Sequence, residues 1–443
     1  MEEEMREALM REEKKESNGS DDGQPWMVYF STFVAVCGSY EFGACTGYSS
    51  PVQDAIIKDL NLTLSEYSLF GSILTFGAMI GAITSGPIAD FIGRKGAMRM
   101  SSASCIAGWL VIYFSKGPWP LDIGRLATGY GMGVFSYVVP VFVAEIAPTD
   151  LRGRLTTLNQ FMIATAASMS YILGTVISWR ALALAGLVPC AILLFGLFFI
   201  PESPRWLAKI GRENDFLASL QKLRGKNADI SDEAQEIQDY ITTLDGLPKP
   251  KLLELFQTRY LRSLTIGIGL MVCQQFGGIN GICFYVSSIF ELAGFPSSIG
   301  NVTYAILQIV ITGIGASLID KAGRKPLLLV SGSGLTVACT ITAIAFYFKV
   351  HEVFLEAVPT LAATGLLIFP INIKGRAGSI ATLTNWFGAW LCSYTFNFLM
   401  SWSYYGTFFV YAAINALTVL FIIVVVPETT GRSLEQLQAS INK

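Results

Sequence analysis

The chain has 443 residues, of which 52% are hydrophobic and only 14% are charged. Soluble domains carry about 25% charged residues, so this composition excludes an ordinary soluble protein. The formal net charge of −2 is too small to indicate a nucleic-acid partner.

The first part of the chain alternates charged segments with apolar stretches. Residues 1–26 are predicted to form a disordered cytosolic tail, and no apolar segment follows the first basic residues as a cleavable signal peptide requires. Apolar stretches of about 20 residues can cross a bilayer as helices. We predict such spans at 27–49, 66–89, 97–115, 121–146, 156–178 and 181–200.

The second part begins with a long polar segment at 201–262, which we predict to be a cytosolic linker with short helices. Further spans follow at 263–290, 299–319, 326–348, 378–400 and 404–426, and 427–443 is a cytosolic C-terminal tail. Segment 353–369 is a marginal span of roughly 25 Å as a helix, because the hydrocarbon core is about 30 Å thick.

The distribution of the 31 Lys and Arg predicts the orientation in the membrane. With a cytosolic N-terminus and alternating spans, nearly all of them face the cytosol, as the positive-inside rule requires. The exceptions are Lys58, Lys116, Arg180 and Lys349 on the opposite face, and Arg125 within a span.

Short motifs occur twice in the same order. The sequence DFIGRK at 90–95 returns as DKAGRK at 320–325. Two further pairs follow in the same order. In the first, EIAP followed by RGR matches IFP followed by KGR. In the second, PESPR matches PETTGR. These repeats predict a duplicated membrane bundle of the kind from which transporters are built, with the substrate between the halves.

These motifs resemble the sugar porter branch of the major facilitator superfamily over residues 27–438. The sequences GYSSP at 47–51 and FPINIKG at 369–375 are most similar to plant early-responsive-to-dehydration type monosaccharide transporters. The resemblance implies an all-α membrane protein with two six-helix bundles, at 27–200 and 263–426, and a truncated tenth helix. It implies transport of hexoses or related sugars by alternating access, with a sugar and the lipid bilayer as partners. It implies no enzyme activity, catalytic residue or cofactor.

Amide side chains are the predicted sugar ligands. Amides are costly in hydrocarbon unless paired, and they offer the donors and acceptors that sugar hydroxyls need. The sequence QQFGGING at 274–281 lies in the seventh span, which the family uses to hold sugar. Gln274, Gln275 and Asn280 of that segment are the first candidates. The resemblance adds Gln160, Gln308 and Asn385, which match family positions, and hydrogen bonding between helices is the alternative role for each of the six.

A second set of polar residues resembles the family's cytosolic ion-pair lattice, which closes the inner side. Its candidate members are Asp90, Arg94, Glu145, Arg152, Asp320 and Arg324. Asp and Arg four residues apart share one side of a helical turn. The second lattice glutamate is missing, because Leu367 occupies its place.

Arg125 is a candidate for proton coupling, since proton-coupled members pair the equivalent arginine with an aspartate in the first span. Cys45 stands at that position, and Glu41 one turn earlier is the available carboxyl group. Because a thiol is a poor proton carrier, we favour facilitated diffusion over proton-coupled symport or antiport. The eight cysteines show no metal-ligand spacing, so no metal site or disulfide is predicted.

The tenth span departs from the family. About twenty residues are missing between intact flanks, which is typical of alternative splicing and predicts poor transport or none. A transport-defective membrane protein that modulates an intact sister transporter, by homo- or hetero-oligomerisation, therefore stays an alternative. The sequence does not distinguish the plasma membrane from the vacuolar membrane as the location.

Overall fold

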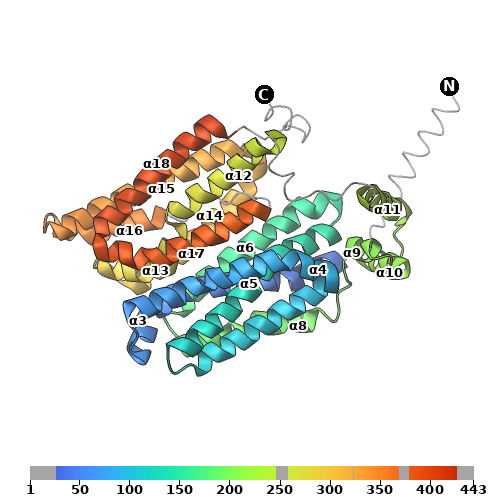
Figure 1. Cartoon of the computed structure of the whole chain (residues 1–443), viewed down its shortest axis with the longest axis horizontal. Helices are drawn as coiled ribbons and strands as arrows, with labels where there is room; N and C mark the ends of the chain where they lie inside the picture. The colour runs from blue at the N-terminus through green and yellow to red at the C-terminus, as the bar shows by residue number, and fades with distance from the viewer. Residues whose placement is uncertain (1–25, 246–257, 323, 369–378, 427–443) are drawn as a thin grey trace.

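The computed structural model describes residues 26–245, 258–322, 324–368 and 379–426, and these ranges contain helices and no strand. The predicted tails therefore lie almost entirely outside the described residues. Figure 1 shows two layers of long helices, with the N-terminal helices in one and the C-terminal helices in the other. The described part of the chain is therefore an all-α structure in two layers.

The N-terminal layer contains helices from both the predicted spans and their connections. They are α2 (Trp26–Gly47), α3 (Ser49–Leu60), α4 (Leu64–Phe114), α5 (Pro118–Ile146), α6 (Thr149–Leu173), α7 (Trp179–Ala185) and α8 (Leu187–Gly196). Thr63 caps α4 with its side chain, which accepts from the Glu66 backbone N–H, while the Glu66 carboxylate accepts from the Thr63 N–H at 2.8 Å. This capping box determines where the second span begins.

The C-terminal layer repeats the plan. Its helices are α12 (Thr258–Phe276), α13 (Ile279–Leu292), α14 (Ser297–Ala322), α15 (Arg324–Val350), α16 (Val358–Ile368), α17 (Ser379–Trp402) and α18 (Tyr404–Val425). A short 3-10 helix, η2 (Leu355–Ala357), precedes α16. Seven helical stretches of the described chain are long and apolar enough to cross a membrane.

Four predicted spans differ from the helices observed. The spans at 66–89 and 97–115 lie in one helical stretch, α4, which reverses at Gly93 with φ 82° and ψ 168°. The seventh span is divided between α12 and α13 at Gly278, where φ is 92°. The sixth divides between α7 and α8 at Gly186, where the Trp109 ring leaves little room for a side chain. Hydrophobicity alone could not locate these glycine-dependent breaks.

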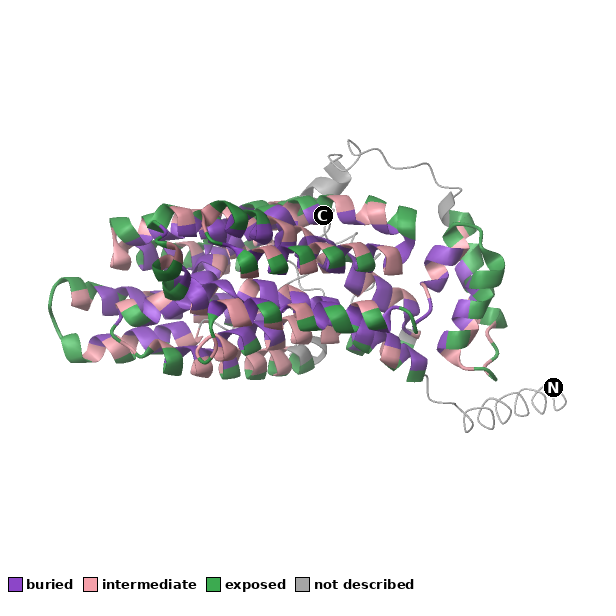
Figure 2. Ribbon diagram, turned by 90° about the horizontal axis from the view of Figure 1, so that it is seen from below, coloured by how far each residue is buried: buried purple, intermediate pink, exposed green. Residues whose placement is uncertain are grey.

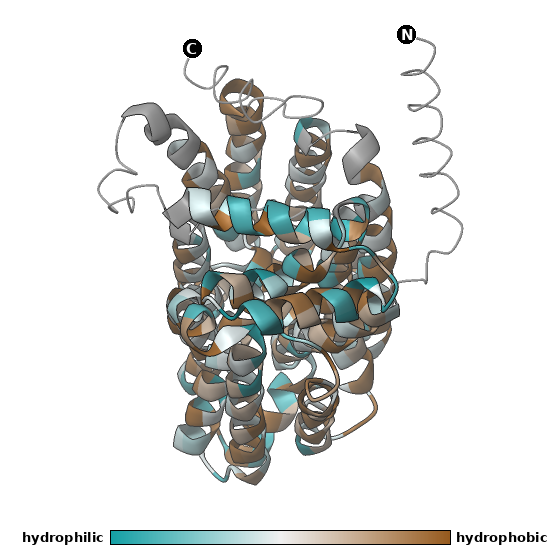
Figure 3. Ribbon diagram, turned by 90° about the vertical axis from the view of Figure 1, so that its right-hand side faces the viewer, coloured by the Kyte–Doolittle hydropathy of each residue, from teal (hydrophilic) through white to brown (hydrophobic). Residues whose placement is uncertain are grey.

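The polar linker forms α9 (Pro204–Lys209), α10 (Glu213–Arg224) and α11 (Ser231–Asp245). These helices pack around a small core of their own, made by Trp206, Leu207, Phe216, Leu220, Ala234 and Ile237. Figure 3 shows their hydrophilic surface crossing one end of the molecule.

The distribution of buried and exposed residues differs from that of a soluble protein. Figure 2 shows the buried residues concentrated between the helices, with exposed residues on their outer faces. Many exposed side chains are large and apolar, including Phe114 (70% exposed), Phe198 (74%) and Val424 (72%). Water would penalise such a surface, whereas lipid tails do not.

Candidate functional site

Three of the predicted amides form one network beside the break in the seventh span. Gln275 is buried near the end of α12, and its Nε2 donates to Asn385 Oδ1 on α17 at 2.6 Å. Asn280, in the first turn of α13, donates from Nδ2 to Gln275 Oε1. The network therefore joins three helices through side chains that can both donate and accept.

Two residues of α18 contact the break between α12 and α13. A Cβ at Gly278 would lie 2.6 Å from the Tyr411 ring, and Asn415 Nδ2 donates to the Gly277 carbonyl at 3.1 Å. Asn415 thus satisfies a backbone carbonyl in the interrupted region. Interrupted helices at membrane depth are tolerated where they line a cavity or are buried in protein, and transporters place substrate sites there.

The other three predicted ligands lie outside that network. Gln308 on α14 accepts a 3.4 Å hydrogen bond from Ser168 on α6, so it bridges the two layers. Gln160 on α6 and Gln274 on α12 are half-buried, and neither side chain bonds to another residue in the described ranges. Their amides are therefore available to a ligand.

Several polar contacts join the two layers near the non-cytosolic ends of the predicted spans. Ser50 and Ser287 hydroxyls are 2.8 Å apart, and Ser288 Oγ donates to Gln53 Oε1 at 2.7 Å. Asn397 Nδ2 donates to Ser68 Oγ at 2.9 Å. These hydrogen bonds link α3 and α4 of one layer to α13 and α17 of the other.

The predicted lattice residues of the N-terminal layer form a compact ion cluster. Arg94 donates to both carboxylate oxygens of Glu145, at 2.8 and 2.7 Å, and to Asp90 Oδ1 at 3.1 Å. Lys209 of the linker also pairs with Asp90, at 2.9 Å. The side chains of Arg94 and Glu145 are only 8% and 15% exposed, so this bidentate pair is geometrically well defined.

The remaining lattice candidates are not brought into that cluster. Arg152 lies in the first turns of α6, and its buried Nε has no hydrogen-bond partner among the described atoms. Asp320 and Arg324 lie near the end of α14 and at the start of α15, but their side chains lie outside the described part.

Arg125 and Glu41 are both fully buried but do not pair with each other in the described structure. Arg125 donates to the Cys45 carbonyl at 3.0 Å and to the Ser49 hydroxyl, and its guanidinium lies 4.9 Å from the Phe70 ring centroid. Glu41 instead accepts from Trp109 Nε1 at 2.5 Å. Cys45 lies between the two charged groups in the sequence and contacts both.

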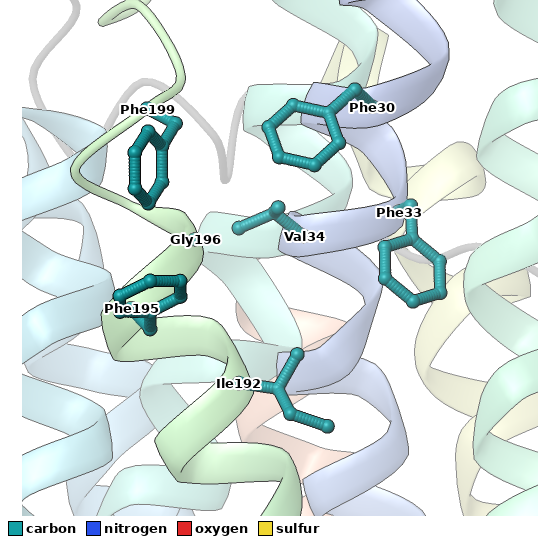
Figure 4. A pocket seen from close by; sticks show the side chains of 7 residues that line it. All are labelled: Phe30, Phe33, Val34, Ile192, Phe195, Gly196 and Phe199. Atoms are coloured by element: carbon teal, nitrogen blue, oxygen red, sulfur yellow. The ribbon is translucent and has the colours of Figure 1, made fainter.

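A groove of about 330 Å³ lies between α2 and α8 (Figure 4). Its lining is entirely apolar: Phe30, Phe33, Val34, Ile192, Phe195, Gly196 and Phe199. It offers no partner for a hydroxyl, so it is not a sugar site.

Three amides that the sequence reasoning missed also bind across helices. Asn159 accepts from Ser39 at 2.5 Å, and Asn397 and Asn415 make the contacts described above. Gln160 was selected by its resemblance to a family position, whereas a search for every amide within an apolar span would have found all three.

The fold and the buried polar centre define a membrane transporter of the major facilitator type. A family model described as "Sugar (and other) transporter" matches residues 7–440. The chain belongs to this sugar transporter family, in its plant ERD6-like group.

Individual relatives agree with that assignment. The chain is 64% identical to sugar transporter ERD6-like 7 of Arabidopsis thaliana, over 97% of each chain. It is 54% identical to ERD6-like 16 of the same plant, over 98% of this chain and 95% of the relative. Among solved structures, the partially occluded inward open xylose transporter XylE from E. coli has a TM-score of 0.76 and 23% identity, covering 92% of this chain and 99% of its own. The chain is thus a sugar transporter and not an enzyme.

Proposed function

We propose that this chain carries hexoses or related monosaccharides by alternating access and facilitated diffusion. The observation that carries the proposal is the amide network of Gln275, Asn280 and Asn385 at the interrupted seventh span. Amides match the alternating donors and acceptors of sugar hydroxyls. The unpaired amides of Gln160 and Gln274, and Gln308 on α14, complete the proposed set of ligands.

Alternating access requires the contacts between the layers to break in turn. The Ser50–Ser287 and Ser68–Asn397 contacts hold the layers together at the predicted non-cytosolic side. We infer that this arrangement is closed to the outside. In the opposite state these hydrogen bonds part, and the Arg94–Glu145 cluster, with Arg152, Asp320 and Arg324, closes the cytosolic side.

Passive transport is supported by the surroundings of Arg125. Its guanidinium is satisfied by the Cys45 carbonyl, the Ser49 hydroxyl and two aromatic faces, so it needs no titrating carboxylate. Glu41 is held by Trp109 and Cys45 instead.

Uptake of radiolabelled glucose by liposomes that contain Gln275→Ala or Asn280→Ala tests the proposed site. Each deletion leaves a buried polar partner unsatisfied, which costs about 1–3 kcal/mol, so uptake at low sugar should fall about fivefold to hundredfold. Gln238→Ala is the matched control, because Gln238 lies in the exposed linker helix α11. Unchanged uptake in both site variants would refute the site.

Proton-coupled transport through Glu41 and Arg125 is the second candidate, favoured by the complete burial of Glu41. It predicts a proton flux on sugar addition that Glu41→Gln abolishes. Facilitated diffusion predicts no proton flux and uptake that an imposed pH gradient leaves unchanged.

The third candidate is a transport-defective form that modulates an intact relative. The short α16 favours it, since this helix cannot cross a bilayer by itself. Co-purification with an ERD6-like relative, without sugar uptake by this chain alone, would support it. The cytosolic N-terminus and the choice between plasma and vacuolar membrane are further proposals, which a fluorescent tag and protease protection would test.

A further inference from the structure

A cluster of thiol and carboxyl groups lies buried inside the N-terminal layer. Glu41 and Cys45 come from α2 and Cys105 from α4, and their ligand atoms all lie within 4.8 Å of one another. Cys190 on α8 lies near Glu41 and Cys105, but it is not one of the three residues whose ligand atoms lie within that distance. All four side chains are inaccessible to solvent.

One atom of this cluster has no partner. Glu41 Oε1 accepts from Trp109 Nε1 at 2.5 Å and from Cys45 Sγ at 3.3 Å. Glu41 Oε2 is buried without a hydrogen-bond partner in the described structure. An unsatisfied buried carboxyl oxygen is costly, so a ligand at this point would be stabilising.

We propose that Glu41, Cys45, Cys105 and Cys190 bind one thiophilic d10 cation, Zn²⁺ or Cu⁺. Thiolate ligands select these ions, and three sulfurs with one carboxylate oxygen complete a tetrahedral zinc site. Ligand atoms around tetrahedral zinc lie about 3.7 Å apart, given Zn–S bonds of about 2.3 Å. The 4.8 Å limit observed for Glu41, Cys45 and Cys105 therefore requires only a small contraction, and Cys190 has to move towards them to become the fourth ligand.

The surroundings match those of a metal site. Trp109 Nε1 holds one oxygen of Glu41 and leaves the other free, as outer hydrogen bonds orient metal ligands elsewhere. Arg125 binds the Cys45 carbonyl at 3.0 Å, which places a positive charge beside the thiolates. Each coordinated thiol releases its proton on binding. The bound ion would tie α2, α4 and α8 together and would prevent Glu41 from carrying protons.

Metal analysis of the purified full-length chain tests the site. The protein is expressed with added zinc, passed over chelating resin and measured by mass spectrometry for zinc and copper. We expect about one ion per chain, and at least a fivefold loss in Cys105→Ser and Cys190→Ser. Cys37→Ser and Cys273→Ser, which alter cysteines outside the cluster, should keep the ion. Cobalt exchanged into the wild type should give thiolate charge-transfer absorption.

Three outcomes would overturn the proposal. The first is a wild-type chain with fewer than about 0.1 ions. The second is equal metal content in the Cys105 and Cys37 variants, which would indicate adventitious binding. The third is a cobalt-treated wild type without charge-transfer absorption, and this result holds even where the cysteine variants fail to fold.

Discussion

Gly93 shows how one residue type determines the reversal within α4. Its φ of 82° and ψ of 168° lie in a region that only glycine adopts without strain. A Cβ there would lie 2.7 Å from Glu202 Oε2 and 3.1 Å from the Trp206 ring. Glu202 in turn accepts from the backbone N–H groups of Lys95 and Ser203. Burial raises the pKa of Glu202, and these two N–H groups oppose that shift.

We predict that Gly93→Ala destabilises the protein by about 1–3 kcal/mol, through backbone strain and contact with Glu202. Thermal unfolding in detergent, followed by fluorescence, would measure the loss. Gly153→Ala is the matched control, because a Cβ at Gly153 meets nothing within 4 Å. Equal melting temperatures for the two variants would contradict the prediction.

At the scale of elements, the short α16 is the difference from the family pattern that we expect to affect transport most. It has 11 residues and spans roughly 16 Å at about 1.5 Å per residue, about half of the hydrocarbon core. It packs mainly on α15. The alignment with ERD6-like 7 covers 448 residues, more than the 443 of this chain, so some positions of the relative have no counterpart here.

We predict that inserting about twenty apolar residues before Ile368 raises sugar uptake severalfold, because a full helix can then cross the core. Radiolabelled hexose uptake in a transporter-deficient cell would measure the gain. An insertion of the same length in the exposed turn between α10 and α11 is the control. Equal saturable uptake by the present and lengthened chains would mean that residues 353–369 already complete the bundle.

At the scale of the whole molecule, two acids lie side by side where the layers join, at the side predicted to be non-cytosolic. Asp54 of α3 lies beside Glu291 of α13, and Ser288 of α13 bonds to Gln53 of α3. Partial burial and Glu291 raise the pKa of Asp54 to about 6, and Lys58 opposes the shift. Glu291 also accepts from Ser297 at 2.8 Å. Both side chains stay accessible to solvent, although neighbouring atoms cover part of Asp54.

The sign of the pH effect follows from this shift. When the layers part, Asp54 loses Glu291 and its pKa returns towards its ordinary value, so protons bind the closed state more tightly. Acidifying the outer side from about pH 7 to 5 should therefore favour the closed outer side. Distances between spin labels on the outer ends of α3 and α13 would report the change.

Two variants test whether Asp54 is the group responsible for the pH response. Asp54→Asn should stay closed at neutral pH and lose the pH response, because a neutral amide does not repel Glu291. Asp59→Asn should keep the response, since Asp59 pairs with Arg180 of its own layer. A pH response that survives in Asp54→Asn would assign it to another group.

Local sequence determined the features that depend on neighbours along the chain. Apolar length predicted the membrane helices, and the spacing of Asp90 and Arg94 predicted their ion pair, because residues four apart share a helical face. Resemblance selected Gln275, Asn280 and Asn385 as candidates. Their hydrogen bonds, however, depend on how α17 packs against the interrupted seventh span.

Only the tertiary structure decided which distant residues meet. Spacing along the chain shows no relation between Cys45, Cys105 and Cys190, yet packing of α2, α4 and α8 brings their thiols to one buried carboxyl group. The partners of Arg125 and the Asp54–Glu291 contact are equally invisible in the sequence. The physical reason is that a helix determines its own periodicity, whereas contacts between helices depend on how their side chains interlock.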